Sequence, residues 1–73
     1  MKKFEIYLLN EGTKIFNVPE EYLFMNVNEY IGSVDKASQV KTLIYKYEVE
    51  NLDGDGQYLI IEKDNNKTTY YVY

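Results

Sequence analysis

Hydrophobic and polar residues alternate near the start of the chain, as they do in a strand with one buried face. Phe4, Ile6 and Leu8 share one side of a strand predicted over residues 3–9. A second β-type run, residues 14–18, follows after a short polar stretch. The close spacing of the two runs predicts an N-terminal β-hairpin.

The hydrophobic period changes to that of a helix after residue 26. Asn26 and Glu29 fit a capping box, in which each side chain accepts a hydrogen bond from a free backbone N–H. A competing frame begins the helix at Pro19 and ends it at Gly32. The later frame has the longer apolar stripe, so we predict one helix over about residues 27–40, with its stripe formed by Val27, Tyr30, Ile31, Val34, Ala37 and Val40.

Three β-type runs follow, over residues 43–49, 58–62 and 68–73. The loops between them are rich in Asp, Asn and Gly, which favour tight turns. The runs predict a C-terminal three-stranded antiparallel meander with two-residue turns at 53–54 and 65–66. Together with the hairpin and the helix, the meander predicts an α+β fold in one small domain that spans the whole chain, residues 1–73.

The predicted turns fix which residues of the meander share a face. They place Ile60 opposite both Tyr47 and Tyr71, and Tyr58 opposite both Val49 and Tyr73. One face is then formed by these residues and Tyr45; the other is formed by Ile44, Leu59, Ile61, Tyr70 and Val72. Both faces are apolar near the centre, and one helix covers only one of them. The other face is covered either by a neighbouring molecule or by the N-terminal strands.

Composition restricts the chemistry. The chain has no Cys and no His, and all eight of its basic residues are Lys. Thiolate and imidazole ligands are therefore excluded, as is the bidentate recognition of phosphate or guanine by Arg. We predict that the protein is not an enzyme, holds no cofactor and makes no direct contact with nucleic acid. No apolar run reaches the ~20 residues of a spanning helix, so we also predict a cytoplasmic protein without membrane contact.

Residues 51–62 have the spacing of an EF-hand calcium loop. Oxygen ligands and glycine fall at most of the required positions, occupied here by Asn51, Asp53, Asp55, Gly56, Gln57 and Glu62. The exceptions are the neutral Asn51 at the first position and Leu59 at the ninth, which has no side-chain oxygen. An EF-hand needs a helix on each side, whereas both flanks alternate like strands. The pattern therefore favours a plain turn and no metal, with a weak calcium loop within a β-hairpin as the alternative.

Tyrosine and acidic charge are the remaining signals. The chain has a net charge of −4 and nine tyrosines, six of them between Tyr45 and Tyr73. Tyrosine gives a protein interface a large contact area at little entropic cost. We therefore predict a partner-binding surface that docks on the basic surface of another protein and is formed by Tyr45, Tyr47, Glu48, Glu50, Asp53, Asp55, Tyr58, Tyr71 and Tyr73.

In size and charge the chain resembles the small acidic inhibitors encoded by phages and mobile elements, some of which occupy a nucleic-acid-binding site on a host protein. The resemblance implies an inhibitor that acts by surface contact. Two other functions stay open. One is an oligomeric small-molecule binder or sponge, with a pocket between copies at the apolar sheet face. The other is a structural subunit of a larger assembly.

Overall fold

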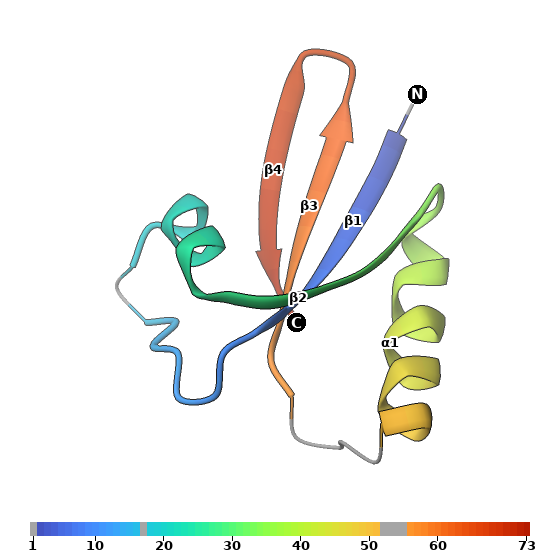
Figure 1. Ribbon diagram of the computed structural model, residues 1–73. Coiled ribbons are helices and arrows are strands. Elements are labelled where there is room, and N and C mark those ends of the chain that lie inside the picture. Colours follow the sequence, from blue (N-terminus) through green and yellow to red (C-terminus); the bar gives the residue numbers. More distant parts are fainter. Residues whose placement is uncertain (1, 17, 52–55) are drawn as a thin grey trace.

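The computed structural model describes residues 2–16, 18–51 and 56–73 (Figure 1). Four strands form one antiparallel sheet in the order β2-β1-β3-β4. The elements in chain order are β1 (Lys2–Leu9), the 3-10 helix η1 (Glu20–Asn26), β2 (Val27–Val34), α1 (Ala37–Asn51), β3 (Tyr58–Asp64) and β4 (Lys67–Val72). The predicted α+β class is confirmed.

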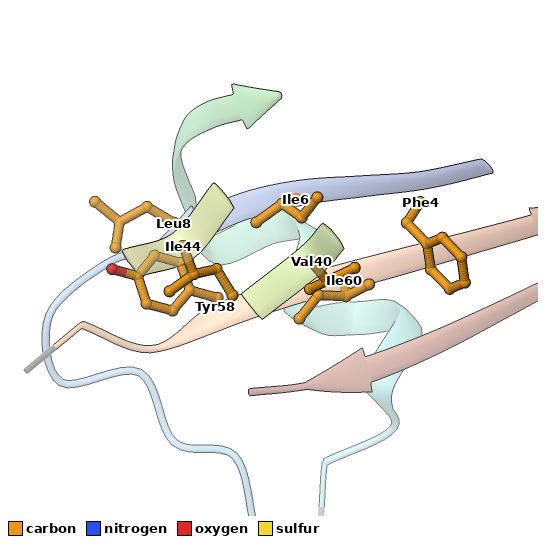
Figure 2. Packing of buried hydrophobic residues seen from close by; sticks show 7 residues of the cluster. All are labelled: Phe4, Ile6, Leu8, Val40, Ile44, Tyr58 and Ile60. Carbon is orange, nitrogen blue, oxygen red and sulfur yellow. The ribbon is translucent and has the colours of Figure 1, made fainter. Parts of the chain in front are cut away.

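Both faces of the sheet are apolar, and different parts of the chain cover them. On one face α1 packs against alternate residues of β1 and β3, in a cluster of Phe4, Ile6, Leu8, Val40, Ile44, Tyr58 and Ile60 (Figure 2). On the other face Leu23 of η1 packs against Leu9, Leu59 and Ile61, and we call this cluster the second core. This face is therefore covered by η1, with Ile15 and Val18 before it, and not by the N-terminal strands, which belong to the sheet itself.

The C-terminal hairpin has the predicted register. Ile60 lies opposite Tyr71, and Tyr58 and Tyr73 exchange both backbone hydrogen bonds, at 3.2 and 2.9 Å. Asn65 takes a positive φ of 55° in the turn, a conformation that Asn tolerates better than most residues do. The alternation of side chains and the two-residue turn at 65–66 are therefore confirmed.

The predicted N-terminal strand pair is present, but its second strand lies elsewhere. β1 pairs with β2, at Val27–Val34, and the predicted strand at 14–18 is wrong. Ile15 and Val18 are half-buried and pack against the second core, so this apolar run covers the sheet and forms no strand of it. The competing helix frame at Pro19 is partly right, because η1 follows it and ends at Asn26.

The helix predicted over about residues 27–40 is wrong, because its first eight residues form β2. The register of β1 with β2 shifts between Ile6, opposite Gly32, and Tyr7, opposite Tyr30, so Ile31 is an extra residue on the β2 side. Ile31 and Val34 both pack against the α1-side cluster. The bulge therefore gives a strand the three-residue apolar spacing of a helix.

The strand predicted over residues 43–49 is also wrong, because these residues belong to α1. Val40 and Ile44 are buried, and Leu43 and Tyr47 pack beside them, which is one helical stripe. The helix begins after Lys36, whose backbone N–H donates to Gln39 Oε1 at 3.1 Å. The predicted pairings of Tyr47 with Ile60 and of Val49 with Tyr58 therefore do not occur, and β1 takes the place beside β3.

Candidate functional site

A groove of about 330 Å³ lies on the α1 face of the sheet, open to solvent. It exists because α1 packs over β1 and β2 and leaves β4 uncovered; in Figure 1, β3 and β1 lie between β4 and α1. We call it the tyrosine groove, and its walls are formed by Phe4, Ala37, Val40, Lys41, Ile60, Glu62, Tyr71, Val72 and Tyr73.

Two of the predicted contact residues, Tyr71 and Tyr73, stand together in this groove. They are 45% and 52% exposed, and they are two positions apart on β4 and its extension, so their rings are on one face. The Tyr71 hydroxyl donates a hydrogen bond to Glu62 Oε1 at 2.7 Å. The backbone of Tyr73 is tied to Tyr58. The Tyr71 ring is therefore held in place, and the backbone of Tyr73 is fixed on a paired hairpin, before any partner arrives.

Three other predicted residues form a second group, deeper between α1 and the sheet. Tyr58 is buried, and its hydroxyl donates to Glu48 Oε2 at 3.1 Å. Tyr47 is half-buried and donates to Glu29 Oε2 at 2.6 Å. The rings of Tyr47 and Tyr58 meet edge to face, with centroids 6.4 Å apart. This arrangement joins α1 to β2 and β3, which is a structural role.

The remaining predicted residues lie on or after α1. Tyr45 and Glu50 are exposed on the helix. Tyr45 is not among the residues that form the walls of the tyrosine groove. Asp53 and Asp55 lie outside the described residues. Of the predicted contact residues that the structure describes, Tyr71 and Tyr73 are therefore the two that it brings together at the groove.

The secondary structure around the calcium-loop pattern, residues 51–62, differs from the one that the sequence suggested. A helix precedes residues 52–55 and a strand follows them, so the prediction of a strand before the loop is wrong. Asn51 Nδ2 donates to the Tyr47 carbonyl at 2.9 Å, and the Glu62 carboxylate accepts the Tyr71 hydroxyl. Among the described residues, no three acidic, His or Cys side chains gather as a metal site would require.

An aromatic cluster on the opposite face was not apparent from the sequence. The Tyr7 ring packs against Phe24 of η1, with centroids 5.3 Å apart, and against Tyr30 of β2, at 5.2 Å. The sequence predicted Tyr30 on a helix and Tyr7 on the side of its strand opposite Phe4, Ile6 and Leu8, so it did not place the two rings side by side. Tyr22 and Met25 of η1 add to the exposed apolar surface here.

Burial raises the pKa of the Tyr7 hydroxyl above its ordinary value of 10.0, and the negative charge of Glu5 adds to the shift. The hydroxyl also donates a 3.3 Å hydrogen bond to Glu5 Oε1, an atom that lies 3.2 Å from Lys63 Nζ. The folded state therefore favours neutral Tyr7 more than the unfolded state does.

Because this pKa is raised on folding, Tyr7 contributes stability below about pH 10, and the contribution is lost as the pH rises through the folded-state pKa. We expect Tyr7→Phe to lose stability less steeply than the wild type above about pH 10. Urea unfolding at a series of alkaline pH values measures both slopes. Equal slopes for the two proteins would show that Tyr7 is not linked to folding in this way.

Gly56 lies against Tyr58 closely enough to leave no room for a side chain. An added Cβ would be 2.9 Å from Tyr58 Oη and 3.1 Å from Leu8 Cδ1. Gly56→Ala should displace the hydroxyl that binds Glu48 and destabilise the fold by about 1–3 kcal/mol in urea unfolding. In a Tyr58→Phe background the added cost should be smaller, because the nearest atom is gone. Wild-type stability of Gly56→Ala would contradict this packing.

Comparison with known proteins does not identify the site. Within the part of the chain that the structure describes, no helix has the length and apolar character needed to span a membrane. The chain matches no protein-family model, no curated protein and no solved structure.

Proposed function

We propose that this protein is a protein-binding module that acts by surface contact through the tyrosine groove. The observation that carries the proposal is the pair Tyr71 and Tyr73, held half-exposed on a rigid hairpin beside an apolar groove that α1 leaves open. Preformed aromatic side chains next to a pocket are typical of the residues that dominate protein–protein binding energies.

The charge of the chain supports a basic partner. The net charge is −4, and the last turn of α1 contains Glu48 and Glu50 but no basic residue. Glu48 accepts the Tyr58 hydroxyl within the fold, so the exposed Glu50 is the acid of this turn that a partner can reach. A negatively charged surface is suited to steering a positively charged partner.

An inhibitor is the form of this function that the size and charge of the chain support best. A compact acidic module that covers a basic surface would compete with nucleic acid for that surface while making no direct contact with nucleic acid itself. We therefore propose a host protein with a basic, nucleic-acid-binding site as the target. The cytoplasmic location stays a prediction.

A small-molecule binder is the second candidate, and the groove volume favours it. About 330 Å³ is at the lower end of the range for ligand sites, and apolar side chains line most of the groove, with Lys41 and Glu62 as charged groups. This function would need only the groove, whereas a protein partner would also contact the surface around it.

Affinity capture followed by reconstitution distinguishes the two functions. The purified protein is immobilised and incubated with an extract of its native host, and the proteins that it retains are identified by mass spectrometry. Each retained protein is then purified and titrated with this protein alone. We expect one basic protein to bind directly, with an affinity that falls as salt is raised. If no purified protein binds, or if native mass spectrometry finds a small molecule held instead, the protein-binding proposal is wrong.

A further inference from the structure

We propose that β4 pairs antiparallel with β4 of a second copy of this chain, so that two tyrosine grooves join into one site. The inference goes beyond the proposed function, because the pairing holds whether or not the joined groove receives another protein. It rests on the open edge of the sheet, on the sequence of β4 and on the apolar surface at both faces beside it.

The outer edge of β4 offers backbone groups with no partner strand. Tyr73 and Tyr58 exchange both backbone hydrogen bonds, and antiparallel strands alternate bonded and non-bonded pairs. The N–H and C=O groups of Thr68, Tyr70 and Val72 therefore point away from β3. Within the described part of the chain, no strand lies beyond β4 (Figure 1).

The two edges of the sheet differ in their protection. On β2 the register with β1 shifts twice, and such irregularities twist an edge away from further pairing. β4 pairs with β3 without any shift. From Thr68 to Val72 it contains only β-branched and aromatic residues, with no Pro, no Gly and no charge. An unprotected edge of this kind is a template for another strand.

The sequence of β4 suits a second copy in particular. Thr68 and Val72, whose backbone groups point away from β3, lie two residues before and two residues after Tyr70. A two-fold axis beside Tyr70 therefore places Thr68 of each copy opposite Val72 of the other. Two copies that each have a net charge of −4 then meet at a segment without charge. Both α1 helices come to lie on one side of the combined sheet, with the two grooves between them.

Exposed side chains beside β4 supply area for this interface. Tyr71 and Tyr73 flank the edge on the α1 face, and η1 packs against β4 on the other face with Tyr22 59% and Met25 85% exposed. At about 200 Å² for each large side chain, the exposed parts of these four residues offer at most roughly 500 Å² per copy. Two copies offer at most about 1,000 Å², the lower limit of a specific interface, so we expect a weak dimer, in the micromolar range.

The geometry of η1 leaves the side chains of Tyr22 and Met25 exposed. In a 3-10 helix, residues three apart share one side. Leu23 faces the sheet and Phe24 packs on Tyr7 of β1, while Tyr22 and Met25 share the remaining side. That side contacts neither the second core nor the Tyr7 ring.

Sedimentation equilibrium over about 1 to 500 μM, a range centred on the expected affinity, tests the pairing. We expect twice the monomer mass at the high end. Thr68→Pro removes an outward N–H without removing a bond to β3, so it should stay folded and shift the dimer midpoint at least about tenfold higher. Thr68→Val is the matched control and should dimerise like the wild type. A dimer that persists unchanged in Thr68→Pro would overturn the proposal.

Amide hydrogen exchange locates the interface in the unmodified chain. The amides of Thr69 and Tyr71 point to β3 and should be protected at every concentration. Those of Thr68, Tyr70 and Val72 should gain protection only as the dimer forms. A monomer at all concentrations, or a dimer that leaves these three amides unprotected, would contradict the pairing; so would protection that appears only when another protein is added. Binding of a host protein is measured in a separate experiment, so the dimer proposal and the protein-binding proposal can be contradicted independently.

Discussion

Leu23→Ala is expected to lower the free energy of unfolding by about 2–5 kcal/mol. Leu23 is fully buried and packs on Leu9, Leu59 and Ile61 in the second core. Truncation would leave a cavity beneath η1 and weaken the cover of that sheet face. A domain of this length has about 4–11 kcal/mol of stability in total, so much of it would be lost.

Urea unfolding followed by circular dichroism measures this effect, and the chain offers a matched control. Tyr22 precedes Leu23 in the same 3-10 helix but is 59% exposed, so Tyr22→Ala should change the unfolding free energy by about 0.5 kcal/mol or less. If Leu23→Ala were as mild as its neighbour, η1 would not be the cover of the second face.

Changing both Tyr71 and Tyr73 to Ala is expected to weaken binding of the captured host protein by about 100-fold or more. Truncating an aromatic anchor typically costs about 2 kcal/mol or more of binding free energy. The double variant also removes the hydrogen bond from the Tyr71 hydroxyl to Glu62 in the groove wall. Calorimetric titration measures the affinity.

The control for this variant keeps the residue type and changes the face of the sheet. Tyr30 is as exposed as the groove tyrosines but lies in β2, at the other edge of the sheet. Tyr30→Ala should bind the host protein within about threefold of the wild type, since distant residues contribute little. A loss in Tyr30→Ala as large as that in the double variant would mean that the groove has no special part in binding.

The parts of the fold that were predictable are those whose signals are local. The hairpin of β3 and β4 combines clear alternation with a two-residue turn at 65–66, and these alone fix its register. β1 likewise reads as a strand from its own alternation. No distant contact was needed to identify either segment.

The middle of the chain was mispredicted because its pattern fits two periods. A bulge near Ile31 gave β2 a helical spacing, while Tyr45, Tyr47 and Val49 alternate within α1 as they would in a strand. Only the pairing of β1 with both β2 and β3 separates these interpretations, and that pairing joins residues far apart in sequence.

The residues of the candidate site were likewise predictable only where the sequence signals are local. Tyr71 and Tyr73 were placed together by the register of the hairpin, and the structure keeps them together and exposed. Tyr47 was predicted on a strand that is in fact α1, whereas Tyr58 lies on a strand as predicted but is buried; both rings pack within the fold. The groove beside Tyr71 could not be predicted, because it depends on where α1 crosses the sheet.

Site-specific photocrosslinking tests most directly whether the tyrosine groove is the contact surface. Tyr71 is replaced by p-benzoylphenylalanine in one protein and Tyr30 in another, and each is irradiated with the purified host protein. We predict a covalent adduct with the host protein from position 71 and none from position 30. An adduct from position 30 with none from position 71 would contradict the account.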